Sequence, residues 1–189
     1  MFDPVKLDDV SKNIIAAMSS DMVNHKAWRW ATTHDEELSH LLARDVEYSK
    51  AVFGIERGIE NGRKDIAKWS DVRTEVGYFF DEIFKLTEEK AKATLVGLNW
   101  PDVLEAAQKF ADVYNVSDDK DTWFAKVKTV ATELGYATSG KEFKAEPDKY
   151  RGQVGDIAKI FRVLLTGRTI SPDFIVTLAT HQMLLLNIF

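Results

Sequence analysis

Apolar residues recur every three or four positions along most of the chain, which is the spacing of a helix with one buried face. Two runs in the second half show it most clearly: Val103, Ala107, Phe110 and Tyr114, then Trp123, Val127, Val130 and Leu134. The strict alternation of a half-buried β-strand occurs over no useful length. The pattern therefore predicts an all-α protein, a helical bundle or cage.

Residues that favour helix ends divide the second half into elements. Pro101 suits the first turn of one helix, and the acids from 118 to 121 suit the start of the next, where the helix dipole favours negative charge. Gly135 suits the left-handed residue that follows a helix. We expect a loop over residues 136–147 and then a helix from near Pro147 that ends at Thr166-Gly167.

The last helix is predicted to begin at Ser171 and Pro172. A serine hydroxyl can accept a hydrogen bond from a free N–H at a helix start, and proline suits the first helical position. Arg162 then lies near the end of one helix and Ser171 at the opening of the next. An arginine in this apolar run needs hydrogen-bonding partners if it is buried; alternatively, its aliphatic stem lies along the helix and its guanidinium reaches water.

The first half is also helical in pattern, over residues 6–18, 21–32 and 36–58. An Asn-Gly pair interrupts the pattern, which resumes at Trp69-Ser70. We predict two consecutive helical subdomains, residues 1–68 and 69–189, with a further boundary near residue 98.

Composition excludes several kinds of site. The chain has no cysteine, so disulfides, thiolate catalysis and cysteine-ligated zinc are excluded, and a reducing cytoplasm is the expected location. The four histidines lack the spacing of metal ligands, so no metal is predicted. The start of the chain does not resemble a signal peptide, and the apolar stretch 174–189 is shorter than a membrane span and interrupted by His-Gln. We therefore expect a packed final helix and no membrane partner.

The charge is uneven. The net charge of −5 argues against a nonspecific polyanion binder, whose surface is usually basic, and DNA is not an expected partner. Between Lys141 and Arg168, however, seven basic residues stand against four acids. This segment can form a focused site for an anion.

Common catalytic patterns are missing from the sequence. It contains no GxxxxGK[ST], GxGxxG or GxSxG, and most carboxylates fall at predicted helix starts or on solvated faces. We predict no catalytic residue. Aromatic residues at 28, 30 and 78–80 could stack on RNA bases but suit a core better. A basic set could contact phosphate or simply face solvent; its members are Arg57, Arg63, Lys64, Lys68 and Arg73.

Four segments resemble bacterial glutamyl-tRNA synthetases, in the region after the catalytic domain. They are FDPVKLDDVSKNII (residues 2–15), GRKDIAKWSDV (62–72), WPDVLEAAQKFADVYN (100–115) and FRVLLTGRTISP (161–172). The first resembles the stretch that follows the KMSKS-type loop. The Arg-x-x-x-Thr-Gly-x-x-x-Ser/Thr-Pro pattern of the last is the most specific.

In that family this region is all helical, with a connecting or stem-contact domain followed by an anticodon-binding cage. The resemblance implies these roles for residues 1–68 and 69–189, and places Arg162 on the surface that receives anticodon bases, where the amino terminus of the last helix also offers N–H groups to anions. The residues expected to bind tRNA are Lys159, Arg162, Thr166, Gly167, Arg168, Ser171, Pro172 and Phe174, the last by stacking. Candidates for contact with the RNA backbone are Arg63, Lys64 and Lys68.

Neither a HIGH-type nor a KMSKS-type sequence occurs in the chain. The resemblance therefore implies that ATP binds a catalytic domain absent from this chain, which should be inactive alone and should bind no cofactor. The expected partners are glutamate tRNA and that catalytic domain. Two alternatives stay open: a helical protein-interaction domain that kept the fold without binding RNA, and the equivalent region of a class I lysyl-tRNA synthetase.

Overall fold

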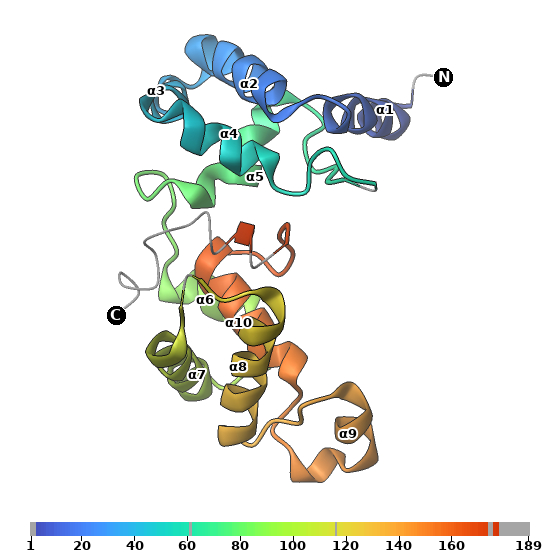
Figure 1. Cartoon of the computed structure of the whole chain (residues 1–189), viewed down its shortest axis with the longest axis vertical. Coiled ribbons are helices and arrows are strands. Elements are labelled where there is room, and N and C mark those ends of the chain that lie inside the picture. The colour runs from blue at the N-terminus through green and yellow to red at the C-terminus, as the bar shows by residue number, and fades with distance from the viewer. Residues whose placement is uncertain (1–2, 61, 116, 174–175, 178–189) are drawn as a thin grey trace. The chain divides into compact units, whose positions relative to one another are not determined.

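The computed structural model describes residues 3–60, 62–115, 117–173 and 176–177 (Figure 1). Within these ranges the secondary structure is helical, and the one β-type contact is an isolated bridge between Ala137 and Gln153. The predicted all-α class is therefore confirmed. The chain divides into two compact units, Met1–Lys85 (unit 1) and Leu86–Phe189 (unit 2), and each has its own hydrophobic core.

Unit 1 is built around α2. Its helices are α1 (Pro4–Ala16), α2 (Ser20–His34), α3 (Glu36–Arg44), α4 (Val46–Gly54) and α5 (Val72–Val76), with 3-10 turns η1 (Trp69–Asp71) and η2 (Gly77–Phe79) on either side of α5. Helix α2 packs against α3 and α4. Fully buried Leu38, Phe53 and Phe80 bring α3, α4 and the segment after η2 into one core.

The region 36–58 is two helices rather than one continuous helical stretch. Asp45 has an extended backbone (φ −138°, ψ 96°), which ends α3, and its carboxylate accepts a hydrogen bond from Tyr48 N at 2.9 Å, which begins α4. Ser49 Oγ then donates to Leu42 O at 3.1 Å across the break. A capping aspartate inside a helical pattern is therefore the physical reason for the division.

The boundary between the units lies after Lys85, not after residue 68. Residues 69–85 were assigned from the sequence to the second subdomain, but Val72, Val76 and Phe80 are buried in the core of unit 1. Their apolar side chains would be exposed if this segment were separated from α2 to α4. The further boundary expected near residue 98 falls inside unit 2, where Leu98 packs against the core.

Unit 2 is organised around α10. Its helices are α6 (Glu88–Thr94), α7 (Trp100–Val113), α8 (Lys120–Glu133), α9 (Gly140–Ala145) and α10 (Val154–Thr166), with a 3-10 turn η3 (Pro147–Lys149) before α10. Helix α10 packs against α7 and α8, and Phe161 stacks on Phe110 with their ring centroids 4.2 Å apart. Trp123 of α8 meets the same Phe110 ring edge-on at 5.9 Å.

Two expectations about unit 2 need correction. The segment expected to be a loop contains α9, which Ser139 caps by accepting a hydrogen bond from Glu142 N at 3.2 Å. The next α-helix begins at Val154 rather than near Pro147, which starts only a 3-10 turn. By contrast, Gly135 has the left-handed backbone predicted for it (φ 76°).

None of the described helices is both long enough and apolar enough to cross a membrane.

Candidate functional site

The carboxyl end of α10 carries the residues predicted to bind tRNA. Lys159, Arg162 and Thr166 are spaced three and four apart, so they follow one side of the helix. Phe161 and Leu164 point into the core instead, and both are buried. Lys159 and Arg162 are half-buried, so they lie on the part of α10 that the core leaves open to solvent.

Thr166 and Gly167 fix the turn that follows α10. Gly167 has a left-handed backbone (φ 69°, ψ 8°), and its N–H donates to Val163 O at 2.7 Å. The buried Thr166 hydroxyl donates to Arg162 O at 2.7 Å and accepts from Arg168 N at 3.2 Å. This one hydroxyl therefore ties the chain after the turn to the last turn of the helix.

The Arg162 side chain reaches over that turn. Its Nε donates to Ser171 Oγ at 3.2 Å, and its Nη1 lies 3.4 Å from Thr169 O. Because Arg162 remains half-exposed, its guanidinium is not sealed in the interior. The structure thus brings together seven of the predicted residues, namely Lys159, Arg162, Thr166, Gly167, Arg168, Ser171 and Pro172; Phe174 lies outside the described residues.

Asp173, not Ser171, caps the segment that follows. Val176 N donates to Asp173 Oδ1 at 3.4 Å and Thr177 N donates to Asp173 O at 2.9 Å, whereas Ser171 Oγ donates to Pro172 O at 3.0 Å. Asp173 also pairs with Lys120 of α8 at 3.5 Å. The Asp173 carboxylate therefore already accepts a hydrogen bond from an N–H group that was predicted from the sequence to bind an anion. The sequence could not decide the capping residue, because serine and aspartate, both present in Ser-Pro-Asp, cap helices about equally well.

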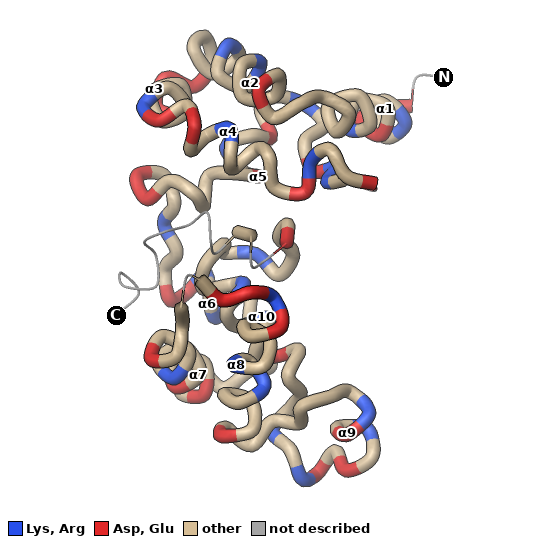
Figure 2. The backbone as a smooth tube through the Cα atoms, in the orientation of Figure 1, with Lys and Arg blue, Asp and Glu red and all other residues tan. Residues whose placement is uncertain are grey.

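Ion pairs neutralise part of the positive charge of the 141–168 segment. Lys149 pairs with Glu146 at 2.5 Å and Arg151 with Asp102 at 3.2 Å, so these two cations are compensated. Lys159 forms no ion pair with any described residue. Figure 2 marks the positions of lysine and arginine along unit 2 in blue. Lys159 therefore leaves positive charge on the solvent-facing side of α10.

The turn also exposes one large apolar residue that the helical pattern does not identify. Ile170 is 80% exposed, beside Ser171 and two positions after Arg168. A large side chain at this exposure offers an apolar surface next to polar donors. Helical periodicity could not identify it, because it lies outside a helix.

The basic set in unit 1 separates into buried and exposed members. Arg63 is interior: its side chain is 4% exposed, its Nε donates to Asp65 Oδ2 at 2.7 Å, and its Nη1 lies 3.4 Å from Val52 O. Its guanidinium therefore serves the fold and is not presented to an RNA backbone. Lys64 and Lys68 are exposed, as a backbone contact requires.

The shifted pKa values of Glu142 and Tyr48 are explained by hydrogen bonding and by burial, respectively. The Tyr150 hydroxyl, and then Thr138, donate to Glu142 and lower its pKa, which fixes the segment between α9 and α10. Burial raises the pKa of Tyr48 to about 12, and its hydroxyl donates to Phe79 O at 2.8 Å. The described part of the chain contains no cluster of three or more His, Asp or Glu side chains suited to a metal.

Comparison of the sequence with known proteins identifies similar proteins. The chain is 41% identical over 177 residues to the glutamate–tRNA ligase of Clostridium perfringens, an alignment that covers 92% of this chain and 32% of the relative. The chain is similar to a region of glutamate–tRNA ligases. The ligase of Clostridium beijerinckii is 38% identical over 178 residues and that of Sorangium cellulosum 36% over 173 residues. The resemblance predicted from the sequence is therefore confirmed.

The chain spans about a third of the length of these ligases, which is consistent with a carboxyl-terminal region. No family model matches the chain, and neither does any solved structure.

Proposed function

We propose that this chain is the tRNA-binding carboxyl-terminal region of a glutamate–tRNA ligase and that unit 2 recognises the anticodon of glutamate tRNA. The observation that carries the proposal is the half-exposed Arg162 guanidinium, held beside the turn after α10 by Thr169 O and Ser171 Oγ. The similarity to glutamate–tRNA ligases over most of the chain supports it.

The chemistry of the turn suits an unstacked base. Sequence-specific proteins usually read RNA in loops, where base edges are free to form hydrogen bonds and base faces are free to stack. A planar guanidinium can donate in pairs to a base edge or stack on a base. Lys159, one turn away, adds positive charge for a neighbouring phosphate. The exposed Ile170 adds an apolar contact.

Each remaining residue has a distinct part in this proposal. Thr166 and Gly167 position the turn, Arg168 contributes charge, and Ser171 and Pro172 form the wall beside Arg162. Phe174 stacks on a base. Glutamate and ATP bind a catalytic domain outside this chain, which acts as its partner in aminoacylation, and the chain alone has no aminoacylation activity.

Replacement of Arg162 tests the proposal. We expect Arg162→Gln to weaken binding of glutamate tRNA by about 1–3 kcal/mol, roughly 5- to 150-fold, because glutamine retains hydrogen bonding but loses charge and the planar fork. The affinity is measured by fluorescence anisotropy at several salt concentrations. Arg151→Gln is the matched control, since it removes the same charge from the segment before α10, away from the turn that Arg162 contacts.

The choice of RNA separates the proposal from its alternatives. Glutamate tRNA with a replaced anticodon should bind the original chain as weakly as intact glutamate tRNA binds Arg162→Gln, and lysine tRNA should bind weakly as well. Equal affinity for the intact and replaced anticodons would contradict anticodon recognition. Absence of binding to every tRNA would favour a protein-interaction domain instead.

A further inference from the structure

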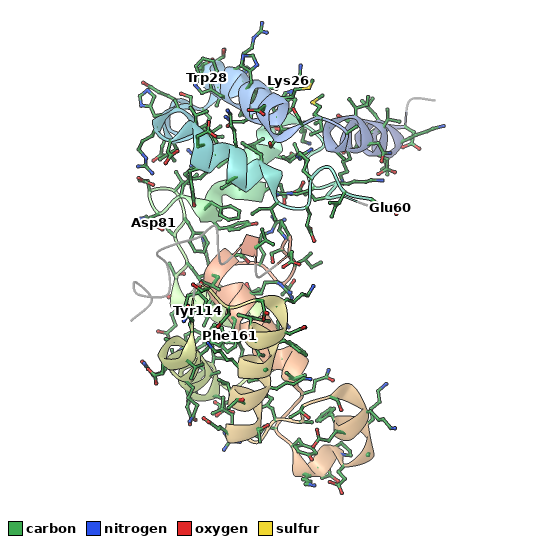
Figure 3. The ribbon with its side chains drawn as sticks, viewed as in Figure 1. Lys26, Trp28, Glu60, Asp81, Tyr114 and Phe161 are labelled. Atoms are coloured by element: carbon green, nitrogen blue, oxygen red, sulfur yellow. The ribbon has the colours of Figure 1, made fainter. Side chains whose placement is uncertain are left out.

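A pocket of about 670 Å³ opens on unit 1 where the α1–α2 connection meets the loop that follows α4. The residues that carry its chemistry are Ser19, Ser20, Arg57, Gly58, Gly62 and Lys64. Its volume is in the range of small-molecule sites. The side chains of this region are drawn in Figure 3, where Glu60 marks the outer end of the loop and does not line the pocket.

Arg57 places a half-buried cation in the pocket. Its Nε donates to Phe53 O at 2.9 Å and its Nη1 to Ile15 O at 2.6 Å, with Ala16 O and Met18 O each at 3.4 Å. These bonds hold the guanidinium rigidly between the carboxyl ends of α1 and α4. All four partners are neutral carbonyl groups, so the guanidinium keeps its full positive charge.

The lining of the pocket contains two cationic side chains and no acidic one. No aspartate or glutamate lines it, and neither Arg57 nor Lys64 forms an ion pair within the described ranges. Burial, and then the nearby charge of Arg63, lower the pKa of Arg57, while Asp65 raises it to a smaller extent, and the arginine stays protonated. An anion in the pocket would attract the guanidinium and so offset the unfavourable energy of burying its charge near Arg63.

The backbone allows an anion to approach closely. Gly58 has a left-handed conformation (φ 76°) with open space where a side chain would stand. Gly62 has a different role: a side chain there would lie 2.8 Å from Glu56 O, so glycine at this position lets the loop pack against itself and opens no space for a ligand. Ser19 and Ser20 add hydroxyl groups and the first turn of α2, although the Ser19 hydroxyl already accepts a hydrogen bond from Met22 N at 3.2 Å.

We propose that this pocket binds phosphate groups, with Arg57 as the fixed cation and Lys64 as the mobile one. The phosphate comes either from an RNA backbone or from a free compound that carries it. The site stands on Arg57, Lys64 and the acid-free lining, so it does not depend on anticodon recognition by unit 2. Only the RNA source rests on the proposed function.

Titration of the full chain with inorganic pyrophosphate tests the site. We expect the backbone amide signals of Gly58 and Gly62 to shift saturably in NMR spectra. Lys64→Ala should weaken this binding about tenfold, the loss of one charge-assisted bond, and Lys64→Glu should abolish it. Lys26→Ala is the matched control, because Lys26 is an exposed lysine of α2 that does not line the pocket (Figure 3).

The pyrophosphate titration can overturn the proposed site, and competition with tRNA identifies the source of the phosphate. Absence of a saturable shift in the original chain, or equal affinities for the original chain and Lys64→Ala, would overturn the proposal. If the site binds pyrophosphate, glutamate tRNA decides the source. Displacement of pyrophosphate by tRNA supports the RNA backbone, and simultaneous binding of both supports a free phosphate compound. Because Arg162→Gln leaves unit 1 unchanged, failure of anticodon recognition would leave the pyrophosphate result intact.

Discussion

A single carboxylate, Asp35, links two helices of unit 1 and caps one of them. It accepts from Arg73 Nε at 2.7 Å and Arg73 Nη2 at 2.9 Å, which ties α5 to the start of α3. It also accepts from Leu38 N at 3.1 Å, which caps α3. The hydrogen bond from Arg73 is the main reason that the pKa of Asp35 lies below its usual value of 3.8.

This arrangement predicts an acid-sensitive contribution to stability. Because the folded pKa of Asp35 is lowered, the stabilisation is fully present above about pH 3.8, the unfolded value, and is lost as the pH falls through the folded pKa. Asp35→Asn should keep the cap but reduce the free energy of unfolding at neutral pH by about 1–2 kcal/mol, since Arg73 is partly exposed. Urea unfolding followed by tryptophan fluorescence at neutral and acidic pH measures the difference.

Glu37→Gln provides the comparison for Asp35→Asn. Glu37 also pairs with Arg73, at 2.7 Å, but its side chain is 57% exposed and caps nothing, so its removal should cost much less. If Asp35→Asn destabilised the chain equally at neutral pH and well below pH 3.8, the ion pair would not be the source of the effect.

At the scale of the element, two glycines end helices by the same backbone conformation. Gly135 follows α8 with φ 76°, and Gly167 follows α10 with φ 69°. A side chain in this left-handed region costs about 1–2 kcal/mol. The two positions differ in what comes next, since only Gly167 leads into the turn that Arg162 contacts.

We therefore expect Gly135→Ala and Gly167→Ala to lower the free energy of unfolding by similar amounts, about 1–2 kcal/mol each. Only Gly167→Ala should also weaken the binding of glutamate tRNA, because it displaces the partners of Arg162. Thermal unfolding and fluorescence anisotropy on the same samples compare the two effects. Equal tRNA affinities for the two variants would show that the turn after α10 does not contribute to tRNA recognition.

The sequence located the helices well and some of their ends poorly, for a definite reason. Glycine after an apolar run is nearly unambiguous, so Gly135 was correctly placed. Short polar residues are ambiguous, because Asp45 and Asp173 can be solvated or can cap a helix, and only the surrounding packing decides. The burial of Arg63 also cannot be predicted from the residues around it in the sequence, since its partner carbonyl on Val52 lies eleven residues away.

At the scale of the whole molecule, each unit has a core that is continuous in sequence. The core of unit 1 uses residues between Ile15 and Phe84, and that of unit 2 uses residues between Leu86 and Leu165. The sequence predicted two subdomains but misplaced their boundary, because the break at residues 61–62 is a stronger local signal than the change of core after Lys85.

Separate cores predict separate responses to mutation. Phe161→Ala removes a ring that stacks on Phe110 and should destabilise unit 2 by about 3–5 kcal/mol. Hydrogen exchange should show lost protection in α7, α8 and α10, with α2 to α4 unchanged. Phe53→Ala, in the core of unit 1, should give the reverse pattern. Loss of protection in both units after either substitution would indicate one cooperative structure.

Continuity of each core in sequence also bears on synthesis by the ribosome. Every described residue of the first core has been translated once Phe84 has been added, and none has to wait for a later segment. At about 5–20 residues per second, synthesis of residues 85–189 takes roughly 5–20 s, which is long compared with the folding of small helical domains. The nascent chain can therefore complete unit 1 before α10 exists, which keeps the apolar faces of the two units from competing during translation.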